Sequence, residues 1–272
     1  MTQDRTFTFA SSQGSVLRIY VEHVLRNLRR SWLVWTIGLI VYAGAIILVY
    51  PSVSEIFDPT MFEGTFYEAF GLEDLAQIGP YIDSQLYDLL PLLLAFYPIT
   101  VFATTVAGQE ERGALDVLFG NPMPRWVLIV SSFLAMGVAL LGISVVLGVS
   151  TWLVAQAIDV DLELGPAMAG ALNMWPVVLM IGTISLLTST LVRQRAVAVG
   201  VAVVIMIAMY LFMVLSELSP DLDWLRYLSV FSYTGDAVAE GFSWPSFFAL
   251  LGIAVALMGL AVAAFNRRDI YT

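Results

Sequence analysis

The chain has 272 residues, of which 59% are hydrophobic and only 12% are charged, and its mean hydropathy is +0.85. A soluble globular domain carries about 25% charged residues, so this composition excludes an ordinary soluble protein and indicates a membrane protein. The net charge of -10 argues against a nucleic-acid partner. The lack of cysteine excludes disulfides and cysteine metal sites.

Six apolar stretches are long enough to cross a bilayer, which takes about 20 helical residues. In chain order we expect the spans at 32–50, 86–107, 127–158, 167–192, 196–216 and 244–265. The predicted fold class is therefore all-α, a polytopic membrane protein that forms a single transmembrane domain over residues 1–272. A loop at 108–125 separates the second and third spans, and a longer loop at 217–243 precedes the last one.

The placement of the arginines predicts the orientation of the spans. All 12 basic residues are arginine, and 11 of them flank one set of span ends: Arg5, Arg18, Arg26, Arg29, Arg30, Arg112, Arg125, Arg193, Arg195, Arg267 and Arg268. By the positive-inside rule this side is cytoplasmic. Both termini then lie in the cytoplasm, which an even number of spans requires, and the localisation is the cell membrane.

Acidic residues divide the opposite way, since 16 of the 22 fall in the three loops that we expect outside the cell. One interpretation is a surface that binds cations. Another is solvation in a medium of high salt, where the repulsion between like charges is screened. We favour the second, halophile-like interpretation, although a codon bias alone can produce an all-arginine composition.

Missing residue types exclude several kinds of activity. A P-loop needs a lysine that reaches the nucleotide phosphates, and this chain has none. A zinc protease helix needs two histidines, and the single one, His23, precedes the first span and is expected to be an interfacial polar residue. The span centres hold no ionisable side chain, which disfavours a proton-driven carrier. We therefore expect no catalytic residue, no metal site and no bound cofactor in this chain.

The stretch 15–30 has apolar residues at helical spacing and charged residues on another face. Glu22 precedes Arg26 by four residues, the favoured order for an ion pair on a helix. This pattern predicts an amphipathic interfacial helix that lies on the membrane surface ahead of the first span.

The loop at 108–125 predicts a short helix. We expect Glu110 and Glu111 at its start, where carboxylates complement the positive end of the helix dipole. An apolar edge and then helix-ending residues follow: Leu115, Leu118 and Phe119, then Gly120, Pro122 and Pro124. One interpretation is a simple connection on the membrane surface, and the other is a docking helix for a soluble partner. In the loop at 217–243 we expect short interfacial helices, with Trp224, Tyr227, Phe231 and Tyr233 at the level of the lipid headgroups.

The same loop carries a resemblance to a known family. It reads Gln109-Glu110-Glu111-Arg112-Gly113-Ala114-Leu115, with Pro122-Met123-Pro124-Arg125 after it. This resembles the permease subunits of type-2, export-type ABC transporters, whose loop reads Glu-x-Glu-x-Gly-[Thr/Ala]-Leu and then Pro-x-x-Arg. The first acidic position falls at Gln109 here. The basic end of the chain, Arg267-Arg268-Asp269, is similar to the tail of such permeases.

The resemblance implies a permease subunit that works with two copies of a separate ABC ATPase subunit, which hold ATP and Mg²⁺. It implies a second permease copy, in a homodimer or a related heterodimer, and a substrate pathway between the two copies. The coupling helix to the ATPase is implied at Gln109, Glu110, Glu111, Arg112, Gly113, Ala114, Leu115, Asp116, Leu118 and Phe119. The alternatives are a membrane anchor that recruits a cytoplasmic partner without transport, and an autonomous secondary carrier.

Overall fold

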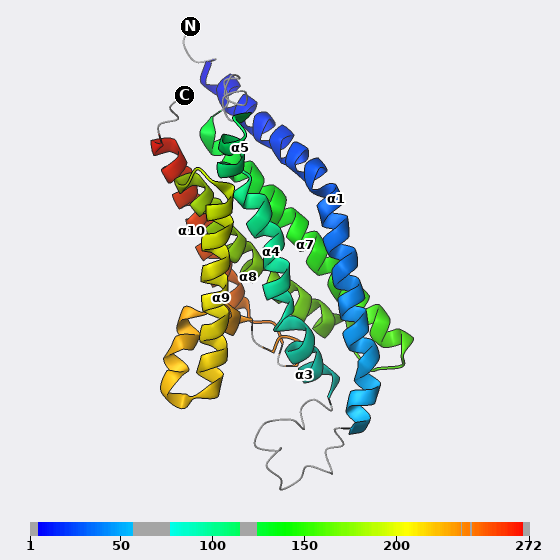
Figure 1. Cartoon of the computed structure of the whole chain (residues 1–272). Coiled ribbons are helices and arrows are strands. Elements are labelled where there is room, and N and C mark those ends of the chain that lie inside the picture. The colour runs from blue at the N-terminus through cyan, green and yellow to red at the C-terminus, as the bar shows by residue number, and fades with distance from the viewer. Residues whose placement is uncertain (1–4, 57–76, 115–123, 235, 240, 269–272) are drawn as a thin grey trace.

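The computed structural model describes residues 5–56, 77–114, 124–234, 236–239 and 241–268, and within these ranges it contains helices and turns but no strand (Figure 1). Six helical segments of the described chain are long and apolar enough to cross a membrane, judged by length and composition. The predicted all-α, polytopic fold with six spans is therefore confirmed.

The first helix, α1 (Arg5–Ile56), is a single element of 52 residues. The stretch 15–30, expected as a separate interfacial helix, continues into the first span without a break. The sequence explains this, because no glycine or proline lies between Gly14 and Gly38. The expected ion pair is present, with 3.7 Å between Arg26 Nη2 and Glu22 Oε2, and Arg18 Nε lies closer to that carboxylate, at 3.0 Å.

The second span begins earlier than expected and consists of three pieces. These are α3 (Ile78–Ile82), a π-helical turn η3 (Asp83–Tyr87) and α4 (Leu90–Ala103). Asp83 interrupts the apolar pattern, which is why the sequence places the start of this span at Leu86. In the structure Asp83 is buried, and its carboxylate accepts hydrogen bonds from the backbone N–H groups of Val238 and Ala239 at 2.9–3.1 Å. A carboxylate that is satisfied in this way can lie inside the bundle.

The remaining spans lie within three residues of the ranges expected from the sequence. They are α7 (Arg125–Ala157), α8 (Leu164–Leu191), α9 (Arg195–Leu218) and α10 (Trp244–Arg267). Helix α8 packs against α4, α7 and α10, and 83% of its most apolar stretch is buried, against 17% for α9 and for α10. The core of the molecule is therefore centred on α8, and α9 and α10 lie at the periphery.

Two short 3-10 helices, η4 (Pro220–Leu228) and η5 (Phe231–Tyr233), follow α9. Trp224 and Tyr227 are exposed there, as expected for aromatic residues at headgroup level. Phe231 differs, because it is buried and packs edge-on against Tyr210 at 5.6 Å between ring centroids. It contributes to the core rather than to the interface.

Helix α1 begins and α10 ends at the same end of the bundle, and α5 (Ala107–Glu111) lies there as well (Figure 1). We call this end, which includes the α8–α9 turn and the start of α7, the terminal end. The other end, which includes η3, η4 and η5, is the distal end.

Candidate functional site

Helix α5 (Ala107–Glu111) follows the second span. The sequence predicts a short helix that Glu110 and Glu111 open, but these two carboxylates are the last two residues of α5. The helix follows a turn at 104–106 and consists of five residues, Ala107–Glu111. Gly113 ends it, with a φ of +66° and a hydrogen bond of 2.9 Å from its N–H to the carbonyl of Glu110. This left-handed conformation favours glycine, so the glycine of the motif has a structural reason to be there.

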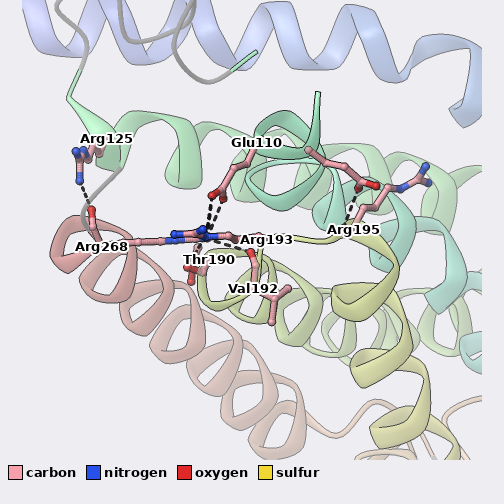
Figure 2. A network of polar contacts seen from close by, with 8 residues as sticks. Glu110, Arg125, Thr190, Val192, Arg193, Arg195 and Arg268 are labelled. Atoms are coloured by element: carbon pink, nitrogen blue, oxygen red, sulfur yellow. Dashed lines mark hydrogen bonds and ion pairs between the residues drawn. The ribbon is translucent and has the colours of Figure 1, made fainter. Parts of the chain in front are cut away.

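Glu110 fixes α5 to the rest of the terminal end (Figure 2). Its carboxylate lies 2.8 Å from Arg268 Nη2 and 3.5 Å from Arg193 Nε. The side chains of Arg268 and Glu110 are only 17% and 27% exposed, so this ion pair is partly shielded from water. Two cations from different segments thus meet one carboxylate of α5.

The Arg268 guanidinium also caps the end of α8. Its Nη1 donates to the carbonyl oxygens of Thr190 at 3.0 Å and Val192 at 3.2 Å (Figure 2). The last carbonyl groups of a helix lack partners within the helix and carry partial negative charge, so a guanidinium there satisfies both needs. Arg268 therefore links α5, α8 and α10.

Arg125, the first residue of α7, completes the network. Its Nη1 donates to the carbonyl oxygen of Arg268 at 2.7 Å (Figure 2). Its guanidinium lies 5.9 Å from the centroid of the Phe265 ring. The start of α7 is thereby tied to the end of α10, directly beside the Arg268–Glu110 pair.

Glu111 makes a different contact from its neighbour. Its Oε2 accepts a hydrogen bond of 3.1 Å from the backbone N–H of Arg195, the first residue of α9 (Figure 2). A carboxylate at this position satisfies an unpaired donor and complements the helix dipole. Glu111 and Arg112 are nevertheless exposed, so they also face outward from the bundle.

Helix α5 lies between two hollows of the surface. On one side Glu111 and Arg112 line a hollow of about 680 Å³ together with Arg195 and Ala196 of α9. On the other side Gln109 lines a hollow of about 600 Å³. The α1 residues His23, Asn27 and Ser31 form much of its polar wall, and α4 and α7 close it.

The sequence matches the family described as "Multidrug efflux system permease Rv1217c, C-terminal domain" over residues 22–266. The chain belongs to this family. A search of curated proteins found no match. The resemblance to the permease subunits of export-type ABC transporters is thus confirmed at the level of the family, and the efflux permease is a multi-pass membrane protein by its family and by its six candidate spans.

The structure of this efflux permease brings only some of the predicted coupling residues together. Gln109, Glu110 and Glu111 lie in α5, and Arg112, Gly113 and Ala114 follow directly. Leu115, Asp116, Leu118 and Phe119 lie outside the described residues. The role of this segment in coupling stays a prediction.

Sequence reasoning missed the partners of the two carboxylates. Arg193, Arg195 and Arg268 served only to orient the spans, yet each contacts Glu110 or Glu111. One signal was present: just six acids fall outside the three acidic loops, and two of them are adjacent on the arginine-rich side. An acidic pair among arginines is a candidate for specific ion pairing.

Proposed function

We propose that this chain is the transmembrane permease subunit of an ATP-driven ABC exporter, coupled through residues 109–119 to a separate ATPase. The observation that carries the proposal is the fixation of α5 at the terminal end. Glu110 binds it through Arg268 to α8 and α10, Glu111 binds it to α9, and Arg112 beside them is exposed. A displacement of α5 therefore moves three spans rather than a loose loop.

Energy from ATP has to come from another chain. A P-loop requires a lysine, and this chain contains none. We propose two ATPase copies, with ATP and Mg²⁺ bound in them, and a terminal end that faces the cytoplasm. The cluster of arginines at that end supports this orientation.

A second permease copy completes the proposed assembly. Apolar side chains along α9 are exposed in the single chain, among them Val204, Ile207 and Leu211. In the assembly this peripheral helix contacts the second copy or lipid, and the substrate pathway lies between the two permease copies.

The double variant Glu111→Ala/Leu115→Ala tests the coupling. We expect it to lose co-purification with the ATPase and ATP-driven uptake of substrate into inverted vesicles, while its elution in size-exclusion chromatography stays normal. The matched control is Glu163→Ala, an exposed acid between α7 and α8 at the distal end, which should retain both activities.

Three other outcomes would contradict the proposal or favour another function. Unchanged co-purification and transport in the double variant contradict the coupling role of this segment. Transport by the purified chain under a pH gradient without any ATPase favours a secondary carrier. Recruitment of a cytoplasmic partner without any flux favours an anchor.

A further inference from the structure

A hollow of about 430 Å³ lies between α1 and α7, on the opposite side of α1 from the one that Gln109 lines. The two helices run side by side over a long distance (Figure 1). Its main lining residues are Leu25, Arg26, Arg29 and Trp32 of α1 and Val138 and Gly142 of α7. Its volume falls in the range of about 300–1,000 Å³ that is typical of sites for small molecules.

The apolar part of this hollow is held in place by a cross-helix hydrogen bond. Trp32 Nε1 donates to the carbonyl oxygen of Ala139 at 2.8 Å. The indole packs close to Gly142, since a Cβ built there would be in van der Waals contact with Trp32 Cζ2 at 3.5 Å. The wall is therefore preformed, and a flexible hydrocarbon chain can lie along it without rearranging α1 or α7.

The edge of the hollow that is nearer to the terminal end carries positive charge. Arg26 and Arg29 lie one helical turn apart on the same face, and both are exposed. Glu22 is the acid paired with Arg26, at 3.7 Å, and it also pairs with Arg18 at 3.0 Å, so one carboxylate is shared by two arginines. Among the residues that the structure describes, Arg29 forms no ion pair.

We expect these arginines near the level of the lipid headgroups, because of their position relative to Trp32. Trp32 is the first residue of the apolar stretch of α1, and tryptophan is enriched at membrane interfaces. Arg26 and Arg29 precede it by one to two turns toward the terminal end. A basic site beside an apolar groove between spans complements an anionic phospholipid: the arginines match its phosphate, and the groove matches an acyl chain.

We propose that the hollow between α1 and α7 is a binding site for one anionic phospholipid of the surrounding membrane. Its phosphate binds Arg26 and Arg29, and one acyl chain lies against Trp32, Val138 and Gly142. The ligand is a lipid of the bilayer and not a transported substrate, so the site is independent of the proposed coupling to an ATPase.

The test is a titration of the purified full-length chain in detergent, read by native mass spectrometry of the 1:1 lipid complex. The probes are phosphatidylglycerol and phosphatidylcholine with identical acyl chains. We expect phosphatidylglycerol to bind about tenfold more tightly, given the contribution of each arginine near a membrane surface. In Arg26→Gln/Arg29→Gln the two lipids should bind equally within about twofold.

The matched control is Arg30→Gln, which removes an exposed arginine from the same helix but from outside the hollow. It should retain the preference for phosphatidylglycerol. A wild-type chain without that preference overturns the proposal, as does a preference that survives in the double variant or that Arg30→Gln abolishes to the same extent.

Two further measurements separate the apolar and the polar parts of the ligand. Gly142→Leu fills the hollow, so it should weaken binding of both lipids while leaving their ratio above about threefold. Glycerol phosphate, which has the headgroup charge but no acyl chain, should not bind measurably. Binding of glycerol phosphate as tight as that of the lipid shows a phosphate site only and contradicts the lipid assignment.

Discussion

Glu110 joins three segments of the terminal end: α5, the end of α10 and the α8–α9 turn. Its carboxylate receives Arg268 of the α10 end and Arg193 of the α8–α9 turn, and Arg268 in turn caps α8. Because the Arg268 side chain is only 17% exposed, its charge depends on this partner for compensation. A buried or half-buried charge that loses its partner costs far more than an exposed one.

Glu110→Gln should therefore destabilise the chain by about 1–3 kcal/mol, because the amide leaves Arg268 without an anionic partner. The measurement is thermal unfolding in detergent. Glu111→Gln is the comparison: its carboxylate is exposed and accepts a backbone N–H, which an amide oxygen can also do, so we expect a change below about 0.5 kcal/mol. Equal losses in the two variants contradict the special role of Glu110.

Asp83 has the corresponding role at the distal end. It is 1% exposed, and its carboxylate holds the backbone of Val238 and Ala239, just ahead of α10. Nearby, the Asn173 side chain of α8 donates to the carbonyl oxygen of Thr234. Side chains of the second and fourth spans thus fix the loop that leads into the sixth.

Asp83→Ala should release this loop, because the buried backbone N–H group of Val238 and the partly buried one of Ala239 lose their acceptor. Each unsatisfied donor costs about 1–3 kcal/mol. Hydrogen–deuterium exchange should become faster at 237–239 but stay unchanged in the middle of α8. Ser84→Ala, at an exposed neighbour, is the control and should leave the exchange at 237–239 as in the wild type. Unaltered exchange in Asp83→Ala contradicts this role of the carboxylate.

At the scale of elements, α8 can lie in the centre because it approaches α4 very closely. A Cβ built on Gly182 would lie 2.5 Å from Pro98 Cβ and 3.3 Å from Phe102 Cδ2, so a larger residue does not fit. Small residues at such crossings are a common feature of helix packing in membranes.

Gly182→Ala should therefore force α4 and α8 apart and lower stability by about 1–3 kcal/mol, the usual cost of overpacking. Gly165→Ala is the matched control on the same helix, since no atom lies within 4 Å of a Cβ there. The measurement is the thermal unfolding temperature of both variants. If Gly182→Ala unfolds at the same temperature as the wild type, the crossing of α4 and α8 is not tight.

The elements also show how far sequence patterns reach. Helices α7, α8, α9 and α10 could be predicted because their apolar runs end at charged residues, glycine or proline. The start of the second span could not, because only the distant backbone N–H groups of Val238 and Ala239 explain a buried Asp83. The continuity of α1 was missed because a change from an amphipathic to a fully apolar pattern does not require a break in the helix.

The candidate site was predictable in part for the same reason. The motif at 109–115 pointed to α5, since it is local in sequence. Its partners Arg193, Arg195 and Arg268 come from segments far along the chain, and their contacts depend on how four spans pack together. Pairing over such distances leaves no periodic signal in a single sequence.

At the scale of the whole molecule, the orientation is open to a direct measurement because the chain has no cysteine. Gln194→Cys places a thiol on the exposed α8–α9 turn at the terminal end, and Asp161→Cys places one on the exposed α7–α8 loop. A membrane-impermeant maleimide should label only Asp161→Cys in intact cells, and both variants after permeabilisation. The reverse pattern means that the terminal end faces outward.

Salt adaptation is also a property of the whole molecule. With 16 of 22 acids in three loops, repulsion among them should weaken as the Debye length falls from about 10 Å at 0.1 M to about 3 Å at 1 M salt. We expect the melting temperature to rise from 0.1 M to 1 M sodium chloride. The rise should be smaller in Asp159→Asn/Asp161→Asn/Glu163→Gln, where three exposed acids are neutralised. A melting temperature that is independent of salt contradicts the adaptation.

The continuity of α1 has a mechanical consequence. A helix of 52 residues is about 78 Å long, more than twice the hydrocarbon thickness of a bilayer, and nothing along it acts as a hinge between its amphipathic part and its span. Pivoting by about 5° about its midpoint moves each end by about 3 Å, in opposite directions. Trp32 holds it to α7 close to that midpoint, and the hydroxyl of Tyr81 donates to the carbonyl oxygen of Ile46 farther toward the distal end. A tilt of this continuous helix therefore couples a displacement on one side of the membrane to an opposite displacement on the other side.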